Sequence, residues 1–489
     1  MVDSASRARL VRLLVPKEPT IPQSFVQNNL PSRGLIARLG LFDATMIVMG
    51  GIVGSGIFIT PYIVARLVHT PALILGAWVA GGALALIGAF VYAELGDRMP
   101  KVGGQYAYLR EAYHPAVGFL YGWVSLLVIH AGGSAATAVT FASYFHELSH
   151  GAIPEKTVAV LAVAVLAAIN CIGVRAGSRV QSAFMILRIA AVVLVVGGGA
   201  WFLVHPPALL AADETGGWRP LLDRPAGFDL LTAFGAAMVP VMFAYGGWQS
   251  SNYIAPEIRE PRKTLPRALL LGVVGVVVLY VVANFVYVQV LTPAGLGSTD
   301  VPASAVMRLA LGQRGAVLIA TAIALSTLGF LSQAMLTYPR VYFAMAQDGV
   351  LPRRFAHLES RSRVPAAAIL LQAAVTIAVV VLGTFEQILS YVVVMDWLFF
   401  GLTAACLFVF RARERRLGAS PEALERNSAS RVPGHPWTTG TFVVAAWLIV
   451  IDTIYKYPRN AGVAVCILLA GIPVYFLLRR HLKGVIGPE

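Results

Sequence analysis

The sequence predicts an all-α membrane protein, a bundle of twelve transmembrane helices. Of its 489 residues, 57% are apolar or aromatic and only 13% are charged, whereas soluble domains carry about 25% charged residues. The apolar residues gather in runs of about 20, the length at which a helix crosses a bilayer about 30 Å thick. Glycines interrupt two of these runs near their centres. This composition excludes a disordered, collagen-like or disulfide-stapled chain.

Twelve apolar runs define the elements that we expect along the chain. A single twelve-helix domain, 41–482, lies between two cytoplasmic tails, 1–40 and 483–489. The expected spans are 43–65, 71–97, 115–148, 156–173, 180–204, 228–255, 265–292, 311–347, 365–384, 387–411, 439–456 and 460–481. Lys and Arg fall in the gaps, mostly on the side of the N-terminus, so the net charge of +14 is interpreted as a topology signal. Nucleic-acid binding would instead need a basic cluster on one exposed face, so we expect no such partner.

The first and sixth spans are predicted to be broken helices. The first contains four glycines within residues 50–56, and the sixth has adjacent Gly246 and Gly247 after Pro240. At membrane depth, non-helical backbone is tolerated only where it lines a cavity. Matching breaks in two successive groups of five helices are typical of inverted-topology repeats. We therefore expect a 5+5 inverted repeat, at about 41–205 and 228–411, plus two extra helices at about 439–481.

The two breaks together suit the binding of a zwitterion. A half-helix that begins after residues 54–56 would present free N–H groups and the positive end of its dipole. A half-helix that ends near residues 243–245 would present free carbonyls. Since 44–65 and 230–256 contain no Asp, Glu, Lys or Arg, the backbone would bind the carboxylate and ammonium of an α-amino acid. Close helix packing of the GxxxG kind is the alternative for either break alone.

Six motifs carry a resemblance to a known family. They are GGIVGSGIFITP (50–61), YAELGDRMPKVGGQYAYLREAY (92–113), FAYGGWQSSN (243–252), EIREPRKTLPRA (257–268), PRVYFAMAQDGVLP (339–352) and GIPVYF (471–476). In this order the chain, from about 38 to 482, resembles the amino acid–polyamine–organocation superfamily, and within it the L-type amino acid transporter branch and its microbial relatives. The resemblance implies a permease or exchanger that carries amino acids across the plasma (inner) membrane by alternating access.

The resemblance also implies a substrate site at the two breaks. In the family, the substrate carboxylate meets the backbone at positions that match Gly54, Ser55 and Gly56, with Ile52 close by.

The substrate amino group meets carbonyls at positions that match Phe243, Ala244 and Gly246. The ring of Phe243 resembles the gate over the bound substrate, Trp248 matches a residue packed close to the pocket, and Gln249 follows where selectivity can be altered. Plain core packing is the alternative for Phe243 and Trp248, although Trp248 lies mid-span, away from the headgroup level where aromatic belts form.

Arg188 in the fifth span and Asp396 in the tenth are the charges expected to matter most. The family has a lysine at the position of Arg188, where its ammonium replaces the sodium ion of sodium-coupled relatives. Because arginine keeps its charge, we expect a fixed cation that bridges to the first break, and sodium-independent transport. A structural ion pair is the alternative. For Asp396 we expect, in order, a salt bridge to Arg188, proton uptake, or contact with a cationic substrate side chain.

Three further sets of polar residues have alternatives of their own. Glu94 is expected to anchor a cytoplasmic gate through basic residues rather than to bind substrate. His130 is expected to be a packing histidine, with a ligand or proton relay as the alternative. Ser326, Gln333 and Thr337 share one helix face and line the pathway or join helices.

The sequence gives little support for other functions or for protein partners. A proton-coupled amino acid or polyamine permease is the second candidate. A membrane-embedded enzyme or channel is a third, without an HExxH, GxSxG, P-loop or filter motif, so no catalytic residue, metal or cofactor is expected. Cys171, Cys406 and Cys466 show no disulfide spacing. The loop 149–156 lacks the cysteine by which animal L-type subunits join a glycoprotein, so no disulfide-linked heavy-chain partner is expected.

Overall fold

The computed structural model describes most of the predicted domain. The described residues are 39–99, 103–149, 151–172, 178–205, 220–253, 255, 258–359, 364–416 and 430–485. The predicted tail 1–40 lies outside them except for its last two residues, and only 483–485 of the C-terminal tail are included. Within these residues the chain is helical and forms no strand; one isolated bridge pairs Leu39 with Ile258.

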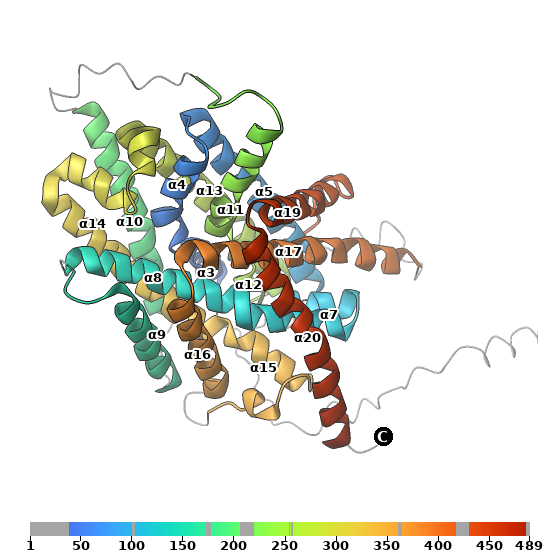
Figure 1. Cartoon of the computed structure of the whole chain (residues 1–489). Coiled ribbons are helices and arrows are strands. Elements are labelled where there is room, and N and C mark those ends of the chain that lie inside the picture. Colours follow the sequence, from blue (N-terminus) through green and yellow to red (C-terminus); the bar gives the residue numbers. More distant parts are fainter. Residues whose placement is uncertain are drawn as a thin grey trace, which may run out of the picture. The chain divides into compact units, whose positions relative to one another are not determined.

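The helices are arranged as Figure 1 shows, and all but α6 and η3 overlap a predicted apolar run. They are α3 (Leu41–Ile52), α4 (Gly56–Leu67), α5 (Pro71–Arg98), α6 (Gln105–Ala112), α7 (Pro115–Val124), the π-helix η1 (Ser125–Ile129), α8 (His130–Leu148), α9 (Glu155–Ile172), α10 (Ser178–Val204), α11 (Phe228–Tyr245), α12 (Ser250–Tyr253), α13 (Pro261–Gly297), α14 (Pro302–Thr337), α15 (Pro339–Gln347), the 3-10 helix η3 (Arg353–Ala356), α16 (Ala366–Leu382), α17 (Phe385–Arg416), α19 (Trp437–Lys456) and α20 (Pro458–Val485).

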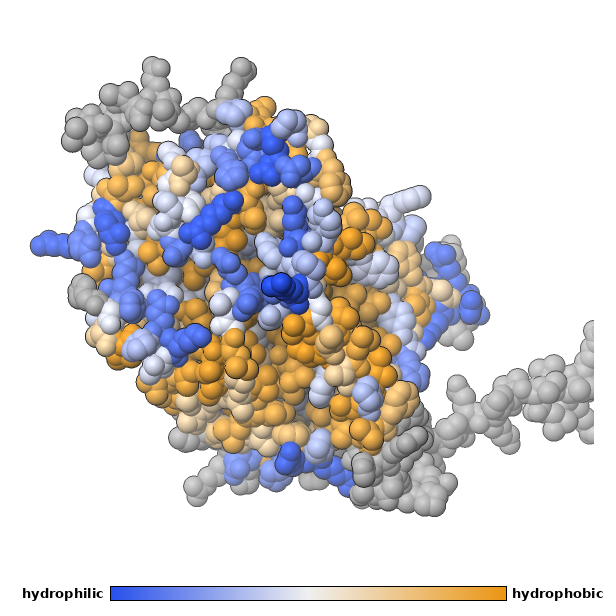
Figure 2. Space-filling model, viewed as in Figure 1, coloured by the Kyte–Doolittle hydropathy of each residue, from blue (hydrophilic) through white to orange (hydrophobic). Residues whose placement is uncertain are grey.

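The predicted class, a helical membrane protein, is confirmed. Ten helical segments of the described chain are long and apolar enough to cross a membrane. The apolar helix α16 has 17 residues, shorter than those ten, and α9 is not among them. The count of twelve spans and the inverted repeat therefore stay predictions. Apolar side chains cover a broad band of the face in Figure 2, and exposed residues such as Leu271 and Val278 suit contact with lipid.

Both predicted helix breaks occur. The helix α3 ends at Ile52 and α4 begins at Gly56, so the first span is two half-helices. The helix α11 ends at Tyr245, Gly247 has a positive φ of 104°, and α12 begins at Ser250. Glycine is the residue that adopts such a φ without steric strain. The two breaks pack together, because α12 contacts α3 and α4 contacts α11.

Two spans differ from the sequence-based expectation. The run predicted at 311–347 is two helices, α14 and α15, since Pro339 cannot continue the hydrogen bonding of α14 and starts a new helix. The run at 115–148 contains the π-helix η1 between α7 and α8. Such π-helices are rare, and they occur frequently at functional sites.

Candidate functional site

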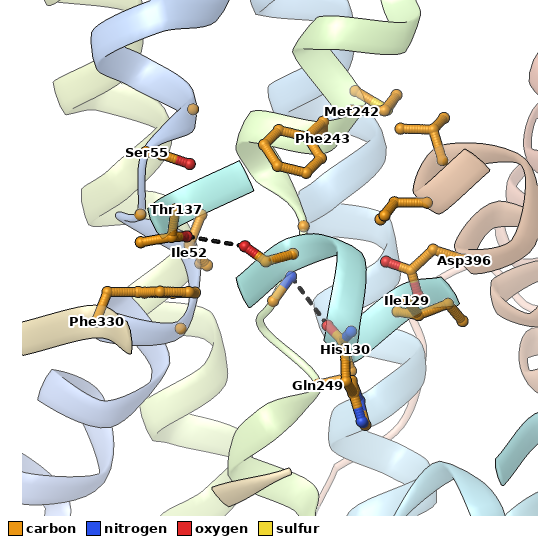
Figure 3. A pocket seen from close by; sticks show the side chains of 18 of the residues that line it. Ile52, Ser55, Ile129, His130, Thr137, Met242, Phe243, Gln249, Phe330 and Asp396 are labelled. Atoms are coloured by element: carbon orange, nitrogen blue, oxygen red, sulfur yellow. Dashed lines mark hydrogen bonds between the residues drawn. The ribbon is translucent and has the colours of Figure 1, made fainter. Parts of the chain in front are cut away.

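One cavity lies between the two breaks (Figure 3) and encloses about 600 Å³ of empty volume, part of it open to solvent. Eight of the predicted site residues line it: Ile52, Gly54, Ser55, Gly56, Phe243, Gly246, Gln249 and Asp396. Three others, Ala244, Trp248 and Arg188, are not among the lining residues. The structure thus brings most of the predicted site together and places the rest behind it.

The N-terminal end of α4 forms the first wall of the cavity. The first N–H groups of a helix have no acceptor within it, and the positive end of the helix dipole lies there. Ser55 is the N-cap of α4 and its hydroxyl makes no capping hydrogen bond. The N–H of Gly54 instead donates to the Ile52 carbonyl over 2.7 Å, so the free donors begin at Ser55.

Gly56 and Gly51 allow the two breaks to approach each other closely. A Cβ on Gly56 would lie 2.6 Å from Cα of Ala244, and a Cβ on Gly51 would lie 2.6 Å from the Gly247 carbonyl oxygen. Ala244 is therefore a packing partner of α4, 1% exposed. For these two glycines the geometry agrees with the close-packing alternative, and a role in substrate binding stays a prediction.

The C-terminal end of α11 forms the second wall. The Gly246 N–H donates to the Phe243 carbonyl over 3.2 Å, and the Gly247 N–H donates to Oε1 of Gln249 over 3.0 Å. The side chain of Gln249 thus stabilises the break itself. The half-buried ring of Phe243 meets Phe385 edge to face, with 6.4 Å between ring centroids.

Trp248 lies behind the cavity in an aromatic cluster. Its ring is fully buried and stacks on Phe400, with centroids 4.8 Å apart. Trp397 does line the cavity, and its ring centroid lies 6.3 Å from that of Trp248. Trp248 therefore packs close to the pocket without lining it.

Arg188 joins α10 to the first break, as expected. Its guanidinium donates to the Gly50 carbonyl over 2.9 Å and to the Ser326 carbonyl over 3.2 Å, with Oε1 of Gln333 at 3.5 Å. Its Cζ also lies 5.4 Å from the ring centroid of Phe330, a cavity-lining residue. Arg188 is 1% exposed. The carbonyls at the C-terminal end of α3 are the negative end of that helix, which attracts a cation.

The expected salt bridge between Arg188 and Asp396 is wrong for this conformation. Among the described residues, the ion pairs do not include one between these two, since backbone carbonyls already occupy the guanidinium. Asp396 lines the cavity from α17 and is 8% exposed, with its Oδ1 buried and without a hydrogen-bond partner in the part of the chain described. A Cβ built on Gly246 would lie 3.8 Å from Asp396 Oδ2, so the carboxylate faces the second break.

His130 lines the same cavity at the start of α8, directly after the π-helix. Its ring stacks on Tyr338, with centroids 4.0 Å apart and 7° between planes, and its Nδ1 lies 3.0 Å from the hydroxyl of Tyr342. The packing expected from the sequence is present, but the histidine is also a cavity residue.

Glu94 has the anchoring contacts that the sequence predicts. Its fully buried carboxylate accepts hydrogen bonds from Arg98 and Arg411, and from the N–H of Val432 over 2.8 Å. These contacts join α5, α17 and the segment before α19.

Sequence reasoning missed much of the cavity lining. The unpredicted residues are Gly51, Ile129, His130, Gly133, Thr137, Met242, Gly247, Phe330, Tyr338, Val392, Val393 and Trp397. Five of them, Ile129, Phe330, Val392, Val393 and Trp397, are apolar residues of helices outside the two breaks, which look like any core position. The described residues hold no group of His, Cys, Asp and Glu that could bind a metal ion, and the three cysteines are free thiols.

Comparison with known proteins agrees with this architecture. The sequence model of the family described as amino acid permease matches residues 39–478. The mouse large neutral amino acids transporter small subunit 2 is 28% identical over 467 residues, covering 94% of this chain and 85% of the relative. The serine/threonine exchanger SteT of Bacillus subtilis is 29% identical over 454 residues, 92% of this chain and 98% of its own length. The human Asc-type amino acid transporter 1 is 30% identical over 452 residues, covering 90% of this chain and 82% of the relative.

Proposed function

The chain belongs to the amino acid permease family, in the L-type branch of the amino acid–polyamine–organocation superfamily, and from this premise we propose that it transports α-amino acids across a membrane. Proteins similar to it over most of their length are transporters or exchangers of amino acids rather than enzymes. The observation that carries the proposal is the cavity between two broken helices whose opposite ends face it.

The main chain binds the part that all α-amino acids share. The substrate carboxylate lies at the N-terminal end of α4, near Ser55 and Gly56, where N–H groups and the helix dipole favour an anion. The ammonium lies at the C-terminal end of α11, near Phe243 and Gly246, where carbonyls accept hydrogen bonds. The Asp396 carboxylate next to Gly246 adds negative charge at that end.

Transport proceeds by alternating access of this central site to the two sides of the membrane. The twelve-helix arrangement is a 5+5 inverted repeat, about 41–205 and 228–411, in one domain of 41–482 with both tails cytoplasmic. Corresponding breaks in the first and sixth spans support the repeat. Excess Lys and Arg on one side support the orientation in a plasma membrane, where Glu94 and its arginines hold cytoplasmic helix ends together.

Transport is independent of sodium. Arg188 contacts the carbonyls at the first break that a cation would otherwise occupy, and its charge does not depend on physiological pH. Reconstituted protein should therefore take up amino acids equally with sodium or choline outside. Uptake that requires a sodium gradient would overturn this part. The absence of a cysteine in 149–156 supports action without a disulfide-linked heavy chain.

A thermal-shift screen of the purified protein against the twenty amino acids tests the whole proposal. A ligand that binds only the folded state raises the melting temperature, by an amount that grows with concentration. We expect stabilisation by a subset of amino acids and uptake of the same subset into proteoliposomes. A screen in which none of them stabilises the protein would contradict the proposal.

Proton-coupled transport is the second candidate, because the buried Oδ1 of Asp396 lacks a partner among the described residues. The variant Asp396→Asn cannot take up a proton at this position. If protons are coupled here, the variant loses the pH dependence of uptake; an unchanged pH profile rejects this candidate.

A further inference from the structure

Two side chains of the cavity carry buried polar atoms without a partner in the part of the chain described. They are Nε2 of His130 and Oδ1 of Asp396, on residues that are 2% and 8% exposed. Buried polar atoms in folded proteins are nearly always hydrogen-bonded. Other buried atoms of the described residues also lack a partner, such as the Tyr245 hydroxyl, but these two belong to residues that line the cavity, where a ligand group can bond to them.

A chain of hydrogen bonds behind His130 determines which kind of group this is. The Thr376 hydroxyl donates to the Gln372 carbonyl over 2.8 Å, so its oxygen accepts from Nε2 of Gln372 at 3.4 Å. With the amide oriented in this way, its Oε1 accepts the hydroxyl proton of Tyr342 over 2.7 Å. The Tyr342 oxygen then accepts from Nδ1–H of His130 over 3.0 Å. A neutral imidazole with its proton on Nδ1 has Nε2 as an acceptor.

Both unpartnered atoms are thus acceptors once substrate is bound, because the proposed ammonium beside Asp396 favours the ionised carboxylate, which only accepts. The matching ligand group is a hydrogen-bond donor. In Figure 3 Ser55 lies at the upper left, Asp396 at the right and His130 below the centre, so this donor is separate from the substrate carboxylate. Asp396 Oδ2 faces Gly246, beside the proposed ammonium position. Because one carboxylate serves both groups, the donor lies only a few bonds from the α-carbon.

We propose that the cavity selects amino acids whose short side chain donates a hydrogen bond, a hydroxyl or carboxamide, to Asp396 Oδ1 and His130 Nε2. This inference rests on the proposed function and adds a substrate class to it. A hydroxyl satisfies one of the acceptors and a carboxamide NH₂ can satisfy both. An apolar side chain of the same shape leaves both acceptors buried and unpaired, which is how a polar site rejects an isostere.

Matched ligand pairs test the proposal on the unmodified protein. Threonine against valine, serine against 2-aminobutyrate, and asparagine against leucine differ in the donor and little in shape. Thermal-shift titration of the purified full chain gives an apparent Kd for each. We expect the donor-bearing member of each pair to bind about tenfold tighter or more. Lysine against norleucine tests a donor at the end of a long side chain.

Variants then assign the effect to residues. His130→Phe keeps the stacking on Tyr338 and removes Nε2, so the threonine-to-valine ratio should fall several-fold. Tyr342 is a positioning residue: Tyr342→Phe frees the His130 proton to move between nitrogens and should lower the same ratio in part. Tyr144→Phe is the control, because it removes a buried hydroxyl from α8 that bonds to the Phe58 carbonyl, and its ratio should equal that of the unmodified protein.

The outcomes separate this inference from the proposed function. If valine and leucine bind as tightly as threonine and asparagine, the inference is overturned while amino acid binding stands. A preference found only for lysine over norleucine also overturns it, because the donor would then be distant. If none of the ligands binds, both the inference and the proposed function are overturned. Should a variant fail to fold, the pairs on the unmodified protein still decide.

Discussion

Two regions around the cavity differ in how completely their polar groups are bonded: the carbonyls at the C-terminal end of α3, and the side chains of Asp396 and His130. At the first break, Arg188 bonds the Gly50 carbonyl and the Tyr280 hydroxyl bonds the Ile52 carbonyl over 3.1 Å. Across the cavity, Asp396 and His130 keep buried atoms without partners among the described residues. Groups that are bonded within the protein hold their geometry without a ligand, whereas unpartnered groups are paired only when a ligand arrives. Substitutions that remove the bonds to the α3 carbonyls should therefore cost stability, and those at Asp396 and His130 should alter binding.

Arg188→Met should give the largest loss of stability. It leaves the Gly50 carbonyl buried without its donor and removes the guanidinium bond to the Ser326 carbonyl, which keeps its bond within α14, and we expect the free energy of unfolding to fall by about 3 kcal/mol. Denaturant titration of the purified protein in detergent measures this. Arg314→Met, at an exposed position of α14, is the control and should change stability by less than about 0.5 kcal/mol. If Arg188→Met is as stable as the unmodified protein, the bonded carbonyls at the end of α3 do not contribute to stability as proposed.

Gly56→Ala should have the next largest effect. Its new Cβ would meet the Ala244 backbone, 2.6 Å from Cα, and backbone cannot move aside as a side chain can. We expect a loss of about 1–3 kcal/mol from overpacking and weaker substrate binding, since α4 and α11 must separate. Gly197→Ala on α10 meets no atom within 4 Å and should be neutral or slightly stabilising. A fully stable Gly56→Ala variant would show that the breaks are not tightly packed.

Tyr280→Phe and Tyr245→Phe form a matched pair. Their rings lie 5.2 Å apart, but only the Tyr280 hydroxyl has an acceptor in the described chain. Tyr280→Phe should cost about 1 kcal/mol because it removes a buried hydrogen bond to the Ile52 carbonyl, which then keeps only the Gly54 N–H as donor. Tyr245→Phe should be neutral or stabilising, since it removes an unpaired hydroxyl. The same denaturant titration compares them, and equal losses would argue against hydrogen bonding as the cause.

Asp396→Asn should have the smallest effect on stability, in the opposite direction. It removes a buried charge without a partner, so the free energy of unfolding should stay equal or rise by about 1 kcal/mol. Asp348→Asn is the contrasting control, because Asp348 accepts from Tyr106 over 2.8 Å and pairs with Arg110, and its loss should destabilise. If Asp396→Asn destabilises as much as Asp348→Asn, the carboxylate has a partner in the empty protein.

Sequence reasoning predicted those parts of the site that depend on backbone chemistry. Glycines and prolines mark both breaks directly, because their allowed conformations differ from those of other residues. Arg188 was identified because it lies within an apolar run, and a charged residue at membrane depth is costly unless it has a function or a partner. The twelve-span count and the repeat symmetry remain predictions.

The remainder of the site depends on packing that a single sequence does not display. Phe330 and Trp397 are ordinary apolar residues until the fold brings them to the cavity. The salt bridge expected for Arg188 was wrong because the sequence displays side-chain charges, while the competing partners are carbonyls present at every residue. Packing was the favoured interpretation of His130, ahead of a ligand or proton relay, because its place at the cavity depends on the π-helix before it.

The π-helix η1 determines which way the side chains of the following helix α8 point. One residue advances an α-helix by about 100°, so a single inserted residue turns the following segment by that angle relative to the preceding one. Gly122, before the insertion, faces Met345 of α15, whereas Gly132, after it, faces Val392 of α17. Deleting one residue from 125–129 would swing His130 away from the cavity while leaving its identity intact. The length of this segment is thus as much a determinant of ligand recognition as any side chain.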